Sequence, residues 1–164
     1  MFDENYEQLS VSHYETTLDI LEQHVDPKYF LSERLKPTIL ADGSANFKSR
    51  SDINQLIART LTASMHKMHR ACQDNYYSQD FIESNGEINH VLDYTKEQLA
   101  QLDIRKLTPQ EAFMLQGFPA QFATNSQNVG VSNGSLYKQA GNAVSVNVIY
   151  AVLYYLITNN IIFE

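Results

Sequence analysis

The apolar segment that follows Gly141-Asn142 and runs to Ile157 constrains the fold most. It is too long for a β-strand, and valine, isoleucine, leucine and tyrosine occupy nearly every face of the helix that it predicts. Ser145 and Asn147 interrupt it, and it is shorter than the roughly 20 residues that cross a bilayer, so we expect no membrane span. Such a helix needs burial on all sides, which one short domain cannot readily provide. A wide apolar patch should therefore stay exposed unless a partner covers it.

A second helix carries its own start and stop signals. Thr108 and Glu111 have the spacing of a capping box, and Pro109 suits the first helical position because that position needs no N–H donor. Gly117 stands where a left-handed cap ends a helix, and Pro119 follows soon after. The sequence therefore predicts a short helix between Thr108 and Gly117.

The remaining pattern predicts short elements of both kinds. Residues 19–26 mix acidic and apolar side chains and predict a short helix. Ser32 can cap a second helix, which Pro37 should kink or end. Residues 42–75 are polar with interspersed β-favouring residues, which indicates strands and loops, and the Gly-, Asn- and Ser-rich residues 125–135 indicate a loop.

The charge balance differs between the whole chain and one window of it. A net charge of -7 argues against a protein that coats nucleic acid. From Lys48 to Arg70, however, five lysines and arginines face only Asp52 among the acids. This window is typical of a focused DNA-contacting loop, and equally of a solvated charged face. The polar, acidic residues 2–10 lack a secretion signal and the single cysteine has no disulfide partner, so we expect a cytoplasmic protein.

Two C-terminal segments together resemble a known pair of sequence blocks. They are Arg105 to Pro119 (RKLTPQEAFMLQGFP) and Tyr137 to Val148 (YKQAGNAVSVNV). In this order and separation they resemble the last two blocks of cytosine carbon-5 DNA methyltransferases. Asp26 to Glu33 is similar to the segment before the family's target-recognition region, and Ala58 to Ala63 resembles the Thr-Leu element inside it. The resemblance implies a recognition region with leading helices over residues 1–104 and the final methyltransferase blocks over 105–164.

The resemblance assigns roles to residues of the last two blocks. It implies that Asn142, Ala143 and Val144 contact S-adenosylmethionine near its amino-acid end. A Gly-Asn pair that opens a long helix would leave outward N–H groups at the positive helix end, which is a seat for an anion. The other interpretation of Asn142 is a simple helix cap. At the position of Arg105 the family has an arginine that holds the recognition region in place, a role that a structural salt bridge fulfils.

The Thr60-Leu61 pair and its flanks are the implied DNA contacts. Hydroxyl groups can bind phosphate, and arginine or lysine can bind phosphate or bases. The candidate residues are Arg59, Thr60, Leu61, Thr62, Lys67 and Arg70. The threonines and the leucine are equally typical of an ordinary half-buried strand.

Two further patterns carry no function in our interpretation. His66, His69 and Cys72 are spaced three apart and could line one helix face as metal ligands, but no fourth ligand is evident, so we expect no metal. Ala71-Cys72-Gln73 echoes the family's Pro-Cys-Gln nucleophile, yet it lacks the proline and lies inside the recognition region. We expect Cys72 to be a small buried or half-buried side chain.

The catalytic elements of the family are missing from this sequence. It contains no Pro-Cys pair, no Glu-Asn-Val triplet and no two glycines one residue apart, so we expect no catalytic residue in this chain. The sequence predicts the C-terminal subunit of a split bacterial or phage-type DNA (cytosine-5-)-methyltransferase that uses S-adenosylmethionine. Its partners would be double-stranded DNA and a larger catalytic chain.

The expected fold class is α+β and incomplete. It combines an irregular strand and loop recognition region, a short capped helix and a terminal helix that docks on the partner's α/β, Rossmann-like domain. Two other interpretations stay open, namely a standalone DNA-binding or regulatory module and an inactive remnant of an interrupted gene. The Gly141 to Val144 block disfavours a simple binder, which has no reason to keep a cofactor contact.

Overall fold

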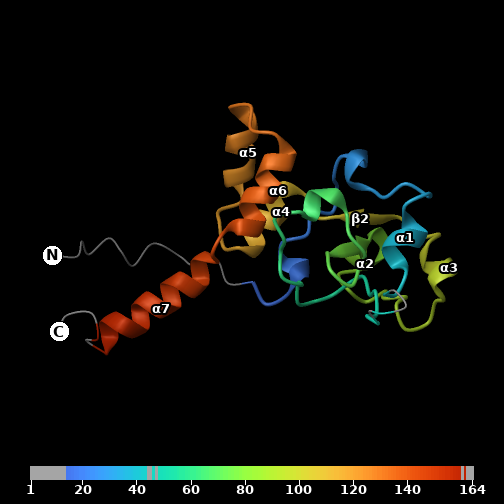
Figure 1. Ribbon diagram of the computed structural model, residues 1–164, viewed down its shortest axis with the longest axis horizontal. Coiled ribbons are helices and arrows are strands. Elements are labelled where there is room, and N and C mark those ends of the chain that lie inside the picture. The colour runs from blue at the N-terminus through green and yellow to red at the C-terminus, as the bar shows by residue number, and fades with distance from the viewer. Residues whose placement is uncertain (1–13, 44–45, 47, 160, 162–164) are drawn as a thin grey trace.

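A two-stranded antiparallel sheet lies inside the body of the molecule (Figure 1). The computed structural model describes residues 14–43, 46, 48–159 and 161. Strand β1 (Tyr76–Ser78) pairs with β2 (Ile104–Lys106), and Tyr77 lies opposite Arg105. A further bridge joins Phe30 to Arg105. Three segments that are far apart in the sequence therefore meet at β2.

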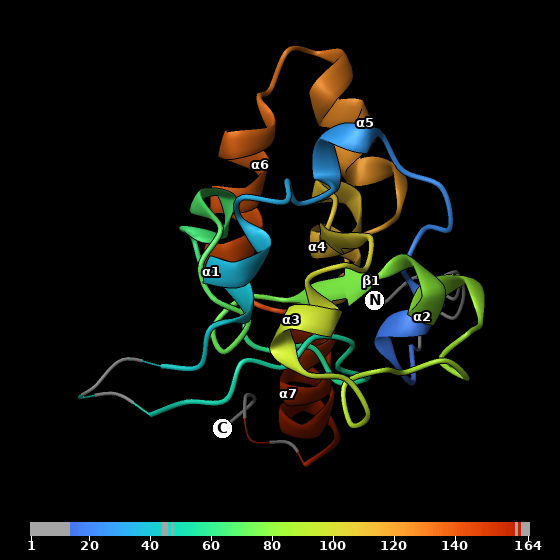
Figure 2. The ribbon, with the colours of Figure 1, turned by 90° about the vertical axis from the view of Figure 1, so that its right-hand side faces the viewer.

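Short helices and turns surround this sheet. They are α1 (Lys36–Leu40), α2 (Gln79–Glu83) and α3 (Lys96–Leu99), with 3-10 turns at Thr17–Asp19, Pro27–Tyr29 and Met65–Lys67. Figure 2 shows α1, α2 and α3 distributed around the strands. Helices α1 and α3 share a core with the strands, which consists of Leu31, Ile39, Leu40, Ile53, Ala71, Tyr76, Leu99, Ala100 and Ile104. Helix α2 packs through Phe81 and Ile82 in a neighbouring core. Together with the small sheet, these helices confirm the predicted mixture of helices and strands.

Three longer helices stand together beside the sheet. They are α4 (Pro109–Leu115), α5 (Gln121–Asn128) and α6 (Asn133–Asn142). Their core contains Met65, Ala112, Phe113, Ala123, Leu136, Tyr137 and Ala140. Met65 belongs to the basic window and not to these helices. The window is therefore anchored to the C-terminal helices through its own apolar side chain.

The predicted capping box of α4 is confirmed. The Thr108 N–H donates to Glu111 Oε2 at 2.7 Å, and the Glu111 N–H donates to Thr108 Oγ1 at 3.2 Å. Gly117 has a φ of 83°, the left-handed conformation expected of the residue that ends this helix. Both ends of α4 are thus determined by local side-chain chemistry.

Two predictions for the N-terminal half are wrong. Residues 19–26 form no α-helix, because the Asp19 carboxylate accepts two backbone N–H groups of the preceding turn and closes that turn as the short 3-10 helix Thr17–Asp19. The described part of residues 42–75 contains loops and one 3-10 turn, and the first strand begins only at Tyr76. Isolated apolar residues such as Ile53 anchor these loops to the core one at a time, which needs no strand pairing.

Two proline and glycine signals also act differently from the prediction. Pro37 lies in the first turn of α1 and does not end it, because that turn needs no N–H donor. Residues 125–135 are mostly helical and not a loop. Gly130, with a φ of 89°, confines the break to a tight turn, and Ser132 caps α6 by accepting the Ser135 N–H.

Gly141 and Asn142 end α6 and do not open the terminal helix. Ala143 has an extended backbone, Ser145 is not helical, and α7 (Val146–Thr158) begins after Ser145. A helix end carries unpaired carbonyl groups and the negative end of the helix dipole. The anion seat predicted at Asn142 is therefore wrong.

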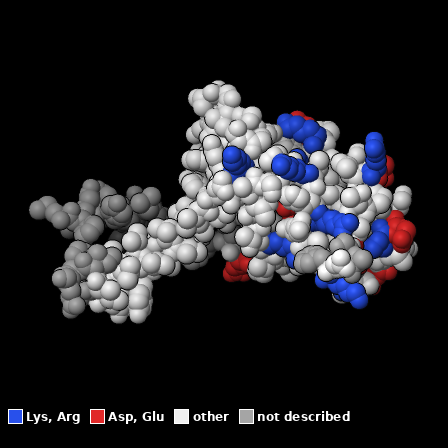
Figure 3. Space-filling model, in the orientation of Figure 1, with Lys and Arg blue, Asp and Glu red and all other residues white. Residues whose placement is uncertain are grey.

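Helix α7 projects from the body as a separate rod (Figure 1). None of its residues is buried, and Figure 3 shows it without the charged side chains that cover the body. Large apolar side chains such as Ile149 and Leu153 are 46% and 47% exposed. The prediction of an exposed apolar patch is confirmed, and the patch extends over the whole helix.

Length and composition alone mark Asn133–Thr158 as apolar enough to cross a membrane, with 6% of the tested window buried. The extended residues around Val144 divide this stretch into α6 and α7. The 13 residues of α7 span only about 20 Å at about 1.5 Å per residue, whereas the bilayer core is about 30 Å thick. Helix α7 alone is too short to cross it.

Candidate nucleic-acid interface

An open hollow lies on the surface of the basic window. It has a volume of about 630 Å³, and its walls come from both ends of residues 59–73. The lining residues are Arg59, Thr60, Thr62, Ser64, His69, Cys72 and Gln73. We call it the 59–73 hollow. It brings together one guanidinium, three hydroxyl groups and one imidazole, which is a set of groups suited to an anion.

Arg59 and Thr62 present polar atoms that have no partner within the protein. Arg59 Nε and Thr62 Oγ1 are both buried from water and make no hydrogen bond. Buried polar atoms are normally satisfied by protein, water or ligand. Both atoms belong to residues that line the 59–73 hollow.

The other three candidate DNA contacts lie elsewhere. Leu61 turns inward and packs in the core, so its side chain faces away from the 59–73 hollow. Arg70 lines an adjoining hollow, which shares His69, Cys72 and Gln73 with the first one. Lys67 is exposed on the 3-10 turn Met65–Lys67. Ser64, His69 and Gln73 join the site through folding of the loop, which no spacing in the sequence signals.

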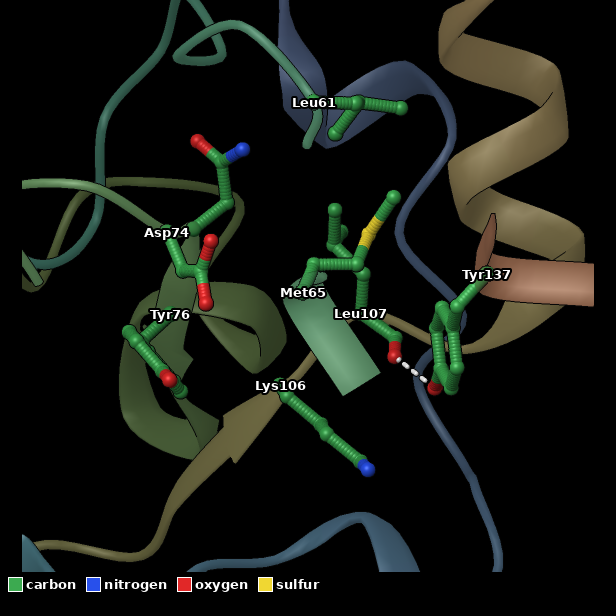
Figure 4. Close-up of a pocket in the computed structure, with 8 residues that line it drawn as sticks. Leu61, Met65, Asp74, Tyr76, Lys106, Leu107 and Tyr137 are labelled. Atoms are coloured by element: carbon green, nitrogen blue, oxygen red, sulfur yellow. Dashed lines mark hydrogen bonds between the residues drawn. The ribbon is translucent and has the colours of Figure 1, made fainter. Parts of the chain in front are cut away.

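A small cavity lies beneath the window, as Figure 4 shows. Leu61 and Met65 line it from the window, and Lys106 and Tyr137 line it from β2 and α6. Its volume of about 20 Å³ suffices for one water molecule. Burial lowers the pKa of Lys106. Burial also raises the pKa of Tyr137, whose hydroxyl donates to the Leu107 carbonyl at 2.6 Å.

Helix α6 touches the backbone of the window at Gly141. A Cβ atom at this position would lie 2.2 Å from the Thr62 carbonyl carbon and 2.4 Å from the Ala63 nitrogen. Only glycine permits this distance between the two backbones. Gly141 therefore serves close packing between the final block and the Thr62 end of the hollow.

The three residues assigned to the cofactor follow directly after this contact. Asn142 and Val144 are exposed, and Ala143 is half-buried. The Ala143 N–H donates to the Ala140 carbonyl at 3.3 Å, so it is occupied by the end of α6. Asn142 therefore lies at the surface directly after the contact between α6 and the window.

Arg105 and Glu111 form a fully buried ion pair with two hydrogen bonds. The distances are 2.9 Å for Nη1 to Oε2 and 2.7 Å for Nη2 to Oε1. Arg105 Nη2 also donates to the Glu22 carbonyl, and the Glu22 N–H donates to Glu111 Oε1, both at 2.8 Å. The pair thus joins the N-terminal segment, β2 and α4. The sequence indicated Glu111 only as a capping residue and missed this second role.

Cys72 is half-buried and lines the 59–73 hollow. Within the described part of the chain, no three histidine, cysteine, aspartate or glutamate side chains are grouped so that they could hold a metal ion. His66, His69 and Cys72 lie on a turn and loop and not on one helix face.

Comparison of the sequence with known proteins identifies related proteins. The sequence matches the family model described as C-5 cytosine-specific DNA methylase over residues 1–158. The type II methyltransferase M.SsoII of Shigella sonnei is 33% identical over 141 residues, which are 82% of this chain and 30% of that protein. The orphan methyltransferase M.Rho11sI of Bacillus phage rho11s is 46% identical over 54 residues, which are 33% of this chain and 11% of that protein.

Solved methyltransferase structures share the fold. EhMeth of Entamoeba histolytica superposes with a TM-score of 0.64 at 20% identity and covers 90% of this chain and 42% of that one. DNMT2 of Spodoptera frugiperda gives a TM-score of 0.59 at 20% identity over 87% of this chain and 42% of that one. The chain spans less than half the length of each of these four relatives. Since the family model covers nearly the whole sequence, the chain belongs to the C-5 cytosine-specific DNA methylase family.

Proposed function

We propose that this chain supplies DNA recognition and one edge of the cofactor pocket to an S-adenosylmethionine-dependent DNA (cytosine-5-)-methyltransferase. The catalytic cysteine would come from a separate, larger chain. Family membership and the fold support the reaction class. The single cysteine, Cys72, follows an alanine and not a proline, which supports a nucleophile from elsewhere.

The exposed helix α7 is the main observation in favour of a partner chain. Its valine, isoleucine, leucine and tyrosine side chains cover every face, and none is buried. Burying about ten such groups is worth on the order of 15 to 30 kcal/mol before entropy losses. Exposed apolar patches of this kind mark interaction sites, and the partner's cofactor-binding sheet is the surface that we assign to α7.

The chain's own residues would act by binding and positioning. The hydroxyls and the Arg59 guanidinium of the 59–73 hollow bind DNA phosphate, while the buried Arg105–Glu111 pair keeps the surrounding segments in place. S-adenosylmethionine supplies the methyl group when bound. Asn142 would contribute a polar contact at one edge of its pocket, since it is exposed and directly follows the contact between Gly141 and Thr62.

The test is methyl transfer from tritiated S-adenosylmethionine to duplex DNA. The chain alone should transfer no methyl group, and its complex with a larger chain that carries a Pro-Cys pair should be active. Truncation after Val144 removes α7 and should abolish the complex. Leu153→Glu, which changes one exposed residue of α7, should weaken the complex without unfolding the body.

Three outcomes would contradict the proposal. The first is methyl transfer by the chain alone. The second is a well-behaved monomer in which α7 is fully protected from hydrogen exchange. The third is duplex binding by the chain without any complex with a larger chain that carries a Pro-Cys pair, which would favour a standalone DNA-binding module.

A further inference from the structure

Arg59 and His69, two residues of the 59–73 hollow, are held by consecutive residues of one buried segment. This segment consists of Asp74, Asn75 and Tyr76 and leads into β1. Asp74 and Asn75 are only 6% and 7% exposed. Polar side chains that are buried so close to the surface need a specific set of partners. Their partners are the residues that form the hollow.

Asn75 fixes the backbone of Arg59 on both sides. Its Oδ1 accepts the Arg59 N–H at 2.8 Å, and its Nδ2 donates to the Arg59 carbonyl at 3.1 Å. The Asn75 side chain thus pairs with both backbone groups of Arg59, as a neighbouring β-strand would. Arg59 is therefore presented to the hollow from a rigid backbone although its segment is a loop.

Asp74 and Tyr76 fix His69 in the same way. Asp74 Oδ2 accepts the His69 N–H at 2.9 Å, and the Tyr76 hydroxyl donates to the His69 carbonyl at 2.6 Å. His69 Nδ1 also lies 3.2 Å from Asp74 Oδ2, although the two atoms do not meet the geometry of a hydrogen bond. The ring is oriented with Nδ1 towards the carboxylate, which leaves Nε2 as the nitrogen that can meet a ligand.

We propose that His69 is a second phosphate-binding cation of the 59–73 hollow beside Arg59, and that Asp74 and Asn75 are the positioning residues for this pair. The inference rests on the proposed DNA-binding function and names a DNA backbone phosphate as the ligand. A phosphodiester carries one negative charge and accepts several hydrogen bonds. The hollow offers it the Arg59 guanidinium, the threonine hydroxyls and the imidazolium of His69.

The contact should depend on pH through His69. Histidine is the side chain that ordinarily changes charge between about pH 6 and pH 8, and only the protonated ring can donate from both nitrogens. The ionisable groups around the ring are Asp74, Tyr76, Arg59, Arg70 and Cys72. A phosphate in the hollow should therefore bind more tightly at the lower pH.

The experiment measures binding of a fluorescein-labelled duplex to the full chain as a function of salt, at about pH 6 and about pH 8. A phosphate contact is independent of sequence, so any duplex serves. At the lower pH, His69→Gln should weaken binding roughly two- to tenfold and reduce the salt slope by up to about one. His69→Lys should restore the slope at both pH values. Cys72→Ser, the matched control in the same hollow, should keep the native pH dependence.

The positioning role of Asp74 has its own readout. Asp74→Asn should weaken binding in the native chain and have no further effect in the His69→Gln chain, because its contribution acts through His69. A merely structural role would give equal losses in both backgrounds. Circular dichroism confirms that each variant is folded before its binding is measured.

The outcomes separate this inference from the proposed function. If the native chain shows no salt-dependent duplex binding, the DNA-binding function itself fails. If it binds, but His69→Gln keeps the native salt slope and pH dependence, His69 is not a phosphate contact. If inorganic phosphate occupies the hollow and the duplex does not displace it, the site belongs to a free anion and the inference is overturned.

Discussion

Replacing Gly141 by alanine tests how the final block is joined to the basic window. Gly141 is not among the glycines with a positive φ, so alanine fits its backbone conformation. The new methyl group would nevertheless lie 2.2 Å and 2.3 Å from the carbonyl carbon and oxygen of Thr62. These atoms belong to the backbone and cannot rotate away. The two segments have to separate.

The geometry sets the size of the effect. The 2.2 Å distance falls about 1.2 Å short of the 3.4 Å at which ordinary contact begins. Overpacking of this kind costs about 1–3 kcal/mol, while alanine in a helix returns at most about 1 kcal/mol. Because the clash involves backbone atoms, its cost lies in the upper part of this range, about 2–3 kcal/mol, and the net loss is about 1–2 kcal/mol. At about 2–4 °C per kcal/mol for a chain of this size, the melting temperature should fall by roughly 2–8 °C.

A glycine in the same helix provides the matched control. Gly134 also lies in α6, and a Cβ atom at this position would meet no atom within 4 Å, so Gly134→Ala should keep or raise the melting temperature. Hydrogen exchange should show faster opening around Thr62 in Gly141→Ala alone, and duplex binding should weaken with it. If the two variants have equal stability and equal duplex affinity, the close contact between α6 and the window does not hold the window in place.

Two further changes test the core and its ionisation. Glu111→Gln leaves the Arg105 guanidinium buried without its counter-charge and should destabilise the chain by about 3–5 kcal/mol in chemical denaturation, whereas the exposed Glu97→Gln should leave the midpoint unchanged. Equal midpoints would refute the structural role of this pair. Burial raises the pKa of Tyr77 from 10.0 to about 12, so the folded state keeps a proton that the unfolded state releases, and stability should fall as pH rises through this interval. In a pH titration, part of the phenolate absorbance should then appear only as circular dichroism reports unfolding. Complete ionisation of the tyrosines in a chain that is still folded would contradict this.

Local chemistry determined the elements that the sequence predicted correctly. The ends of α4 follow from Thr108, Glu111 and Gly117, which act within one turn of themselves. The exposed apolar helix follows from composition alone, because no arrangement of this small body could surround it. The 59–73 hollow was anticipated only through Arg59, Thr60 and Thr62, since these residues are neighbours in sequence.

Predictions failed where distant residues decide the conformation. Residues 42–75 have the composition of strands, yet their backbone groups are bound by side chains such as Asn75, which replaces a neighbouring strand for Arg59. No local pattern reveals that an asparagine before β1 will serve a residue sixteen positions earlier. His69 was missed as part of the hollow for the same reason, because only the Asp74 and Tyr76 bonds place its ring there.

The Gly141-Asn142 pair shows how one motif can be located correctly while its physical interpretation is wrong. A glycine before an apolar helix suggests a helix start that receives an anion, but here the glycine ends α6 and its missing side chain admits the Thr62 backbone. Asn142 consequently follows the contact with the basic window and does not stand at a positive helix end. Any contact from Asn142 to a cofactor must then come from its amide group, without help from a helix dipole. The same packing fixes the end of α6 against the basic window, and the non-helical residues 143–145 then join α6 to α7.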